Sequence, residues 1–251
     1  MNYKFFSALI GLILTTVLCS HAQTPPVLRA PGSPPPLLFR TLGVGMNAPD
    51  LFYIQASGLK TCTVDTQRRS PYYEFSAAGV PLVFVRVVTG ADGKEQRVPV
   101  AQVTVDATLR RVLLIFNAGN SPVDPVQITV LKDDISAVPP GGFRVINYLP
   151  VPAGLTVGTE KLMLQPNAAD TILPKLAPGR SVYEFKVFGI LEGAAVPLFG
   201  TVYGLDTSMR HLVLLFLSSR SPNKMEVKFL SESVQVIRPD EEVPVLPQAG
   251  G

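Results

Sequence analysis

The sequence has few of the side chains that most often carry catalysis or bind metals. It contains two cysteines and two histidines, and charged residues make up only 16% of the chain. Cys19 and His21 fall within the first 22 residues, which we expect to be removed. That leaves Cys62 and His211. One remaining cysteine excludes an intrachain disulfide, and one remaining histidine excludes a site built from several His and Cys ligands.

Charge is also too sparse and too evenly mixed for a nucleic-acid-binding protein. The formal net charge is +3, and the basic residues alternate with acids or stand singly along the chain. A basic stripe that could follow a phosphate backbone is therefore missing. Soluble domains usually contain about 25% charged residues. Because 47% of this chain is hydrophobic, the composition predicts a well-filled globular protein and not a disordered one.

The first 22 residues have the pattern of a secretory signal peptide. Lys4 gives a positive start, residues 5–18 form an uncharged apolar run, and Ser20 and Ala22 are small residues placed for cleavage before Gln23. A retained membrane anchor is the alternative, but a run of about 14 residues is shorter than the roughly 20 that a bilayer span needs. We therefore predict an exported protein, periplasmic or extracellular, with no membrane span after cleavage.

The remaining chain matches itself. Residues 106–116 match residues 206–216 without a gap, and a Ser-Pro pair follows each segment in the same register. Upstream, Tyr-Glu-Phe occurs at 73–75 and 183–185, and Phe-Arg occurs at 39–40 and 143–144. Self-similarity at a fixed period is typical of duplicated units. The pattern predicts two related domains of about a hundred residues each.

The two segments differ in one place. The offset between matching residues is 110 at Tyr-Glu-Phe and 100 at residues 106–116, so the first segment carries ten extra residues. We expect them in a longer hairpin around 89–95, where Asp-Gly between apolar runs indicates a type I′ turn. A loop lengthened in one copy can be a binding tip. This predicts a possible interaction loop made of Gly90, Asp92, Gly93 and Lys94.

The local patterns are those of β-strands. Apolar runs at 80–88, 96–105, 110–116 and 126–131 are separated by turn residues, and residues 183–187 alternate between apolar and charged. Alternation of period two is typical of antiparallel sheets with one buried face. With 24 prolines and 20 glycines, no window of about twelve residues keeps a helical period free of both. The predicted fold is all-β, with two tandem antiparallel β-sandwich (Ig-like) domains related by an internal repeat.

Proline-rich segments set the predicted boundaries. The predicted organisation is a signal peptide at 1–22, a Pro-rich linker at 23–36, β-sandwich domain 1 at 37–138, β-sandwich domain 2 at 139–238 and a Pro-rich tail at 239–251. The join between the domains contains Pro139-Pro140-Gly141-Gly142 and is short. We expect it to keep the two domains close.

Repeated polar residues predict turns and sheet-edge pairs more than a site. Asp and Ser or Thr two residues apart form turns with their own backbone, which predicts turns at 106–108 and 206–208. The arginines at matched strand positions are expected to form ion pairs with nearby acids, which pairs Arg40 with Glu74 and Arg144 with Glu184. Cys62, between two threonines at strand-like spacing, is expected to fill a core, with intermolecular pairing as the alternative.

No catalytic, phosphate-binding or metal-binding motif is found. His211 aligns with Arg111, no Gly-x-Ser-x-Gly motif accompanies it, and no phosphate-binding glycine loop is present. The acids at 91–93 and 132–134 lack the alternating ladder of a calcium loop, although a carboxylate calcium site stays open. The prediction is a protein without enzymatic activity, catalytic residues, cofactor or His/Cys metal site.

The segment Leu131-Lys132-Asp133-Asp134, followed by residues 140–147 (Pro-Gly-Gly-Phe-Arg-Val-Ile-Asn), resembles uncharacterised exported bacterial proteins with two tandem β-rich domains. In that pattern, an acidic strand end leads through Pro and Gly into an aromatic-Arg-aliphatic-Asn strand. The resemblance covers about the middle third of the chain and implies no activity and no site. Periplasmic pilus chaperones are similar in architecture alone.

These observations favour a non-catalytic structural or interaction module of the bacterial cell envelope, with a protein or glycan as partner. The alternative is a periplasmic assembly or secretion chaperone that pairs with the edge strands of its clients. A hydrolase that uses two carboxylates is a third hypothesis, because such enzymes need no histidine.

Overall fold

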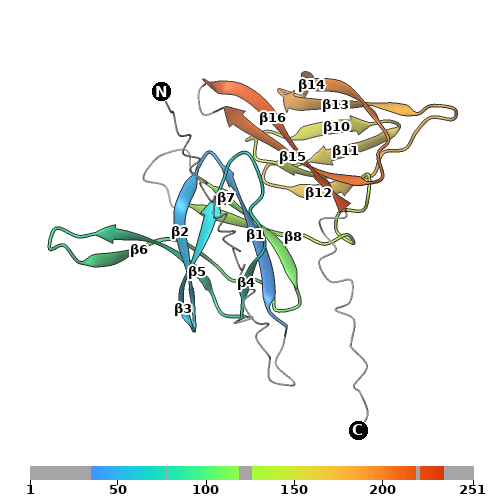
Figure 1. Cartoon of the computed structure of the whole chain (residues 1–251). Helices are drawn as coiled ribbons and strands as arrows, with labels where there is room; N and C mark the ends of the chain where they lie inside the picture. The colour runs from blue at the N-terminus through green and yellow to red at the C-terminus, as the bar shows by residue number, and fades with distance from the viewer. Residues whose placement is uncertain (1–34, 77–78, 119–125, 219–220, 235–251) are drawn as a thin grey trace, which may run out of the picture. The chain divides into compact units, whose positions relative to one another are not determined.

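The structure is a computed structural model that describes residues 35–76, 79–118, 126–218 and 221–234 (Figure 1). The predicted signal peptide, most of the predicted linker at 23–36 and the tail at 239–251 lie outside these residues. No helix within them is long and apolar enough to cross a membrane.

The described residues form β-strands and no α-helix, which confirms the all-β prediction. Sixteen strands are present in this part of the chain: β1 (Leu37–Val44), β2 (Ala48–Gln55), β3 (Gly58–Val64), β4 (Tyr73–Phe75), β5 (Leu82–Thr89), β6 (Glu95–Val103), β7 (Arg111–Asn117), β8 (Gln127–Lys132), β9 (Phe143–Asn147), β10 (Ala153–Val157), β11 (Glu160–Leu164), β12 (Ala169–Ile172), β13 (Val182–Leu191), β14 (Ala194–Gly204), β15 (Met209–Ser218) and β16 (Ser221–Ser233).

The strands form four small sheets in two groups (Figure 1). The first group contains the sheets β4-β1-β7-β8 and β3-β2-β5-β6, and the second contains β12-β9-β15-β16 and β11-β10-β13-β14. Strand orders in the two groups coincide when the strand numbers differ by eight. Both groups also contain one parallel pair, β1 with β7 and β9 with β15.

These parallel pairs correct the expectation of purely antiparallel sheets. A parallel neighbour requires a long crossover connection. Strands β2 to β6 provide that connection between β1 and β7, and β10 to β14 provide it between β9 and β15. The alternation seen in the sequence reports burial of a strand face and carries no information on which strand lies beside it.

Each group has its own hydrophobic core between its two sheets. Aromatic residues dominate both cores: Phe39 packs edge-on against Phe84 in the first group, and Phe143 contacts Phe185 in the second. A third buried cluster joins the groups, and we call it the apolar joint. It consists of Leu42, Val44, Leu113, Ile115 and Leu131 from the first group and Ile146, Leu212 and Leu214 from the second.

The central strands β7 and β15 are therefore buried on both faces. In β7, Val112 and Leu114 face the core of their own group, while Leu113 and Ile115 face the apolar joint. Successive side chains in a strand point to opposite faces, so a strand buried on both sides needs an unbroken apolar run. The runs at 112–116 and 212–216 meet that need.

The faces also show that the gapless match of 106–116 with 206–216 is out of register by one residue within these strands. It equates Leu113, in the apolar joint, with Val213, in the core of the second group. In the structure, Leu113 of the first group corresponds to Leu212 of the second group, because both side chains belong to the apolar joint. Alignment of His211 with Arg111 is wrong for the same reason, since a slip of one residue exchanges the two faces of a strand.

The Tyr-Glu-Phe match and the ten-residue hairpin extension derived from it are also wrong. Residues 73–75 form β4, which pairs with β1, whereas 183–185 lie in β13, in a different sheet position. The β5–β6 hairpin spans Leu82–Val103 and the β13–β14 hairpin spans Val182–Gly204, so the two are of nearly equal length. The first group instead has the longer loop between its third and fourth strands, at 65–72 against 165–168.

Candidate functional site

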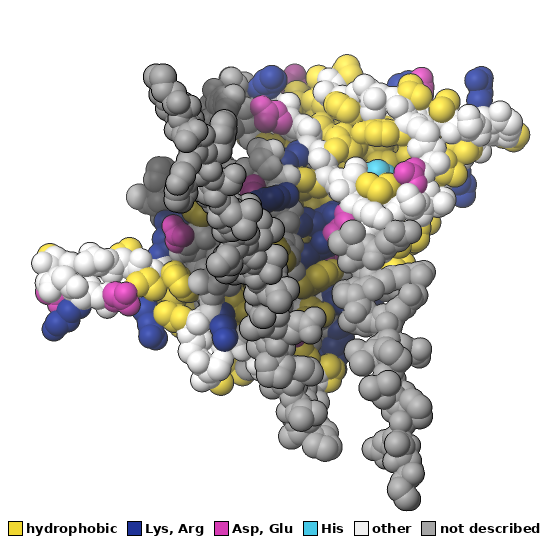
Figure 2. Space-filling view, viewed as in Figure 1, with side chains coloured by type: hydrophobic (Ala, Val, Ile, Leu, Met, Phe, Trp, Pro, Cys, Tyr) yellow, Lys and Arg dark blue, Asp and Glu magenta, His cyan; other side chains and the backbone are white. Residues whose placement is uncertain are grey.

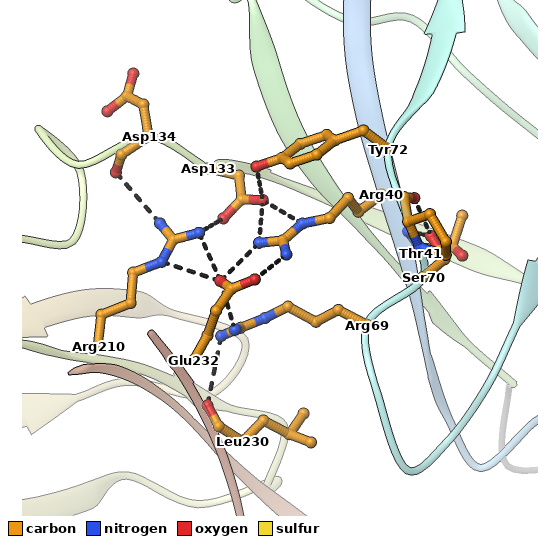
Figure 3. A network of polar contacts seen from close by, with 11 residues as sticks. Arg40, Thr41, Arg69, Ser70, Tyr72, Asp133, Asp134, Arg210, Leu230 and Glu232 are labelled. Atoms are coloured by element: carbon orange, nitrogen blue, oxygen red, sulfur yellow. Dashed lines mark hydrogen bonds and ion pairs between the residues drawn. The ribbon is translucent and has the colours of Figure 1, made fainter. Parts of the chain in front are cut away.

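Charged side chains from both groups meet in one place (Figure 3). They lie beside the apolar joint, because Asp133 and Arg210 line the same small cavity as Leu113. They come from strand β1, the β3–β4 loop and the end of β8 in the first group, and from β15 and β16 in the second. We call this set the arginine cluster: Arg40, Arg69, Asp133, Arg210 and Glu232. Arg40 and Arg210 are 3% and 1% exposed, which is unusual for arginine unless it is paired.

Glu232 on β16 occupies the centre of the cluster and accepts hydrogen bonds from all three arginines (Figure 3). Arg40 binds both carboxylate oxygens, with Nη2 at 3.0 Å from Oε2. Arg69 Nη1 lies 2.9 Å from Oε2, and Arg210 donates to the same oxygen from Nε at 3.2 Å and Nη2 at 3.0 Å. One carboxylate therefore ties two residues of the first group to the second.

Asp133, directly after β8, is the second anion of the cluster. Its Oδ2 accepts from Arg40 Nε at 2.8 Å and from the Tyr72 hydroxyl at 3.1 Å, and its Oδ1 accepts from Arg210 Nη2 at 2.6 Å. Arg210 also reaches the main-chain oxygen of Asp134 at 3.4 Å. Because Arg210 belongs to the second group, Asp133 forms a second ion pair between the groups.

The β3–β4 loop brings Arg69 into the cluster. Asp65 begins the loop as an Asx turn, with its Oδ1 accepting from the Gln67 N–H at 2.7 Å. Ser70 anchors the far end against β1: its N–H donates to the Thr41 oxygen at 3.0 Å, and its Oγ accepts from the Thr41 N–H at 2.9 Å. Arg69 lies between Asp65 and Ser70, whose hydrogen bonds fix the two ends of this loop segment.

The electrostatics of the cluster keep the Glu232 carboxylate ionised. Burial alone would raise the pKa of Glu232, but the hydrogen bond from Arg40 and the charges of Arg69, Arg40 and Arg210 lower it to about 2. Burial raises the pKa of Tyr72 to about 12, aided by the charge of Asp133. A general acid near neutral pH needs a proton to donate. Glu232 holds none in that range, and its oxygens are occupied by guanidinium groups.

The cluster carries one more cation than anion. Three arginines face two carboxylates, and burial lowers the pKa of Arg69 to about 10 against the opposing effect of Glu232. Two guanidinium atoms are buried without a hydrogen-bond partner in the described part of the chain, Nε of Arg69 and Nε of Arg144. Arg144 makes its side-chain hydrogen bond to Thr171 Oγ1, at 3.1 Å.

The predicted interaction loop lies at the tip of the β5–β6 hairpin, and its hydrogen bonds close the turn. Gly90 N–H donates to the Lys94 oxygen at 2.8 Å, Gly93 N–H donates to the Gly90 oxygen at 3.0 Å, and Lys94 N–H donates to Asp92 Oδ1 at 3.1 Å. Gly93 has a φ of 75°, but Asp92 is not among the residues with positive φ. The predicted type I′ turn, which needs positive φ at both central positions, is therefore wrong, although a tight turn is present where it was predicted. In Figure 2 this hairpin exposes basic and acidic side chains.

The structure confirms the two predicted Asx turns. Asp106 Oδ1 accepts from the Thr108 N–H at 2.8 Å, and Asp206 Oδ1 accepts from the Ser208 N–H at 2.8 Å. Each carboxylate also accepts from the hydroxyl of the same partner residue. Both aspartates are therefore used in closing turns at the starts of β7 and β15.

The predicted arginine–glutamate pairs are wrong. Register places Glu74 opposite Leu38, two residues before Arg40 on β1, and Arg40 binds Asp133 and Glu232 instead. Glu184 lies on β13, outside the sheet of Arg144, and forms an ion pair with Lys186. Matching sequence positions thus placed Glu74 on a neighbouring strand but opposite the wrong residue, and placed Glu184 in the wrong sheet.

The contacts of His211 and Cys62 are those of residues that stabilise the fold. The His211 ring stacks on Phe143 with centroids 4.5 Å apart, and its Nδ1 lies 2.8 Å from Ser231 Oγ. Burial lowers the pKa of His211. Cys62 is 1% exposed and belongs to the core of the first group, which confirms it as core filler, and burial raises the pKa of its thiol to about 12.

Among the described residues, no group of three or more His, Cys, Asp or Glu side chains could hold a metal ion. The neighbouring acids Asp133 and Asp134 have separate partners: Asp133 binds arginines, and Asp134 accepts from Ser136 and the Ala137 N–H.

No protein-family model matches the sequence, and no curated protein matches it either.

Sequence reasoning missed the arginine cluster because its members are scattered from residue 40 to residue 232. A partial signal was present. Arg40 and Arg210 each stand beside a run of apolar residues within a strand, and a long charged side chain at such a position is retained in a folded core only when it is paired.

Proposed function

We propose that this protein is an exported, non-catalytic interaction module of the bacterial cell envelope. In this proposal two Ig-like sandwiches, related by duplication, are held together to present loops to a protein or glycan partner. The single observation that carries the proposal is the joint between the groups, in which the arginine cluster and the apolar joint lie side by side.

The joint supports a scaffold role because both of its parts resist separation of the groups. Domains within one chain move relative to one another unless their interface is large and apolar, and eight buried aliphatic side chains form the apolar joint. Separation would also break the ion pairs that cross between the groups: Arg40 and Arg69 with Glu232, and Arg210 with Asp133.

The chemistry of the cluster supports a non-catalytic role. A catalytic carboxylate must exchange a proton or attack a substrate, and both require a free oxygen. Glu232 and Asp133 each accept several hydrogen bonds from guanidinium groups within the protein. Their position and partners are those of structural ion pairs.

Duplication is supported by strand order. Both groups have the same order in both sheets and the same parallel pair at the same place. Arg40 lies opposite Leu113 in one group, and Arg144 lies opposite Leu212 in the other. Two unrelated eight-stranded units would not be expected to agree in order, direction and register.

A second candidate function, a chaperone that acts by strand-edge pairing, is favoured by one observation. Strands β14 and β16 are the longest in their sheets, and each lies at a sheet edge. An exposed edge offers main-chain hydrogen bonds to an added strand. Val202 on β14 is 60% exposed, so a client strand could also contact its side chain.

Site-specific photo-crosslinking in the producing cells tests both candidates. A photoreactive amino acid is placed at Asp92 or Lys94 on one hairpin tip, at Glu192 on the other tip, or at Val202 on the edge strand. An interaction module is expected to give a crosslink from a tip to one folded envelope component. A crosslink from Val202 to an incompletely folded exported subunit would favour the chaperone.

Export and catalysis need separate measurements. The purified mature protein is expected to begin at Gln23 and to be recovered from outside the cytoplasm. Retention of the whole chain in the cytoplasm would contradict the proposed location. Turnover of an ester, glycoside or peptide substrate that is lost in an Asp133→Asn variant, while Asp92→Asn retains it, would contradict the non-catalytic role.

A further inference from the structure

Beside the arginine cluster lies an open hollow of about 420 Å³. The β3–β4 loop lines one part of it and β16 lines another, including Arg68, Arg69, Tyr72 and Ser231. A second hollow, of about 460 Å³, is also lined by Arg68 and Arg69. The two neighbouring arginines of this loop are thus common to both hollows.

Arg69 is the least satisfied member of the cluster. Its side chain is 10% exposed, and its Nε is buried without a partner in the described part of the chain. Nη1 binds Glu232 at 2.9 Å, but Nη2 has only a long contact of 3.5 Å to the Leu230 oxygen. A buried donor without a hydrogen-bond partner is unfavourable, and more so when the group is charged.

The charges around the hollow also favour the binding of an anion. Among the described residues that line it, Glu232 is the only acid, and its carboxylate is already shared by three arginines. Arg68 adds a further cation that is 83% exposed, with Nε bound to Asp65 Oδ2 at 3.1 Å. An approaching cation would meet repulsion, whereas an approaching anion would meet two guanidinium groups.

We propose that this hollow binds an oxyanion, the carboxylate or phosphate group of a ligand, between Arg68 and Arg69. The planar guanidinium group matches the geometry of both oxyanions and can donate two parallel hydrogen bonds to either. Arg68 provides the accessible contact, and Arg69 provides the buried positive charge that the cluster leaves unbalanced. This site is independent of the interaction loop and goes beyond the proposed function.

The hollow also sets the size of the group that is bound. Its volume admits a small molecule or one terminal group of a larger ligand, and ligand pockets of this kind start at about 300 Å³. Three of the polar side chains around it are engaged with the protein: Ser70 with Thr41, Tyr72 with Asp133 and Ser231 with His211. Recognition therefore depends mainly on the two arginines, which select negative charge more than ligand identity.

Titration of the ¹⁵N-labelled protein tests the proposal, with inorganic phosphate and acetate as separate probes at constant ionic strength. Arginine Nε–H signals are followed by NMR. We expect the Arg69 signal to shift in a saturable way with at least one probe. Saturation with phosphate alone assigns a phosphate ligand, and saturation with acetate alone assigns a carboxylate.

Two exposed arginines provide matched variants that preserve the fold. Arg68→Ala is expected to weaken binding about tenfold, because it removes a charged hydrogen bond. Arg97→Ala, on the exposed strand β6, is expected to leave the affinity unchanged. The proposal is overturned if neither probe shifts the Arg69 signal in a saturable way, or if the two variants change the affinity equally.

Discussion

The two groups of sheets agree in strand order but differ in what they contribute to the place where they meet. In the first group the loop at 65–72 brings Arg69 into the arginine cluster and Tyr72 into contact with Asp133, whereas the shorter loop at 165–168 contributes no member of the cluster. The second group contributes Arg210 and Glu232 from strands. Similar sheets thus form an asymmetric joint because their loops differ.

A second contrast concerns two arginines at corresponding strand positions. Arg40 has its guanidinium bound by two carboxylates, while Arg144 binds the Thr171 hydroxyl and keeps a buried Nε without a partner in the described residues. Burial lowers the pKa of Arg144, whereas the acids around Arg40 raise its pKa despite burial. Arginines at corresponding strand positions thus behave differently because Arg40 lies beside Asp133 of its own group and Glu232 of the other, whereas Arg144 lies beside Thr171.

The largest effect is expected from Glu232→Gln, which leaves three buried arginines with one carboxylate. We expect a loss of about 3–5 kcal/mol in the free energy of unfolding, measured by denaturant titration. Glu74→Gln is the matched control, since Glu74 is exposed and should change stability by less than about 0.5 kcal/mol. Equal effects of the two substitutions would contradict the importance of the cluster.

Leu113→Ala tests the apolar joint, with Leu82→Ala as control. Both leucines are buried, but Leu113 lies between the groups and Leu82 lies in the core of the first group. Each should cost about 2–5 kcal/mol. Calorimetry is expected to show a single transition for Leu82→Ala and two for Leu113→Ala, because only the latter weakens coupling between groups. A single transition for both would contradict the joint as the coupling element.

Acid should weaken the joint through Glu232. Its pKa is depressed from 4.5 to about 2 in the folded protein, so its contribution is complete above pH 4.5 and is lost as the pH falls through 2. That contribution is on the order of 3 kcal/mol. Unfolding free energies of the wild type and Glu232→Gln should therefore converge between pH 4.5 and pH 2. A constant difference over this range would exclude the ion pairs as its source.

The smallest effect concerns the hairpin turns. Gly93 has a φ of 75° and Gly193 a φ of 81°, so Gly93→Ala and Gly193→Ala should each cost about 1 kcal/mol from backbone strain. Gly200→Ala, in β14 where no positive φ is found, should be nearly neutral. Thermal unfolding measures all three. A cost confined to Gly93→Ala would show that the two hairpins are less alike than their lengths indicate.

The sequence was sufficient for features that depend on neighbouring residues. Strands around 80–88 and 110–116, the turn at Asp92-Gly93 and the Asx turns at Asp106 and Asp206 were all predicted at or close to their observed positions. Each is determined by alternation or by a side chain that bonds its own backbone. The burial of Cys62 followed from the same local spacing.

The pairing of strands that lie far apart in the sequence could not be predicted from such local patterns. Matching residue types placed Tyr73 with Tyr183 and Arg111 with His211, and both matches failed once the sheets were known. When two strands are aligned with a shift of one residue, similar residue types still match, but each side chain is assigned to the opposite face of the strand. A single sequence gives no information on such a shift.

By itself, the sequence determined an all-β chain with its strands and tight turns, because these depend on local periodicity and on backbone preferences of glycine, proline and aspartate. Only the tertiary structure decided which strands are parallel and which face of β7 meets the second group. It also brought Arg40, Arg69, Asp133, Arg210 and Glu232 together. Those outcomes depend on contacts between residues far apart in the chain, whose partners are selected by the packing of whole sheets.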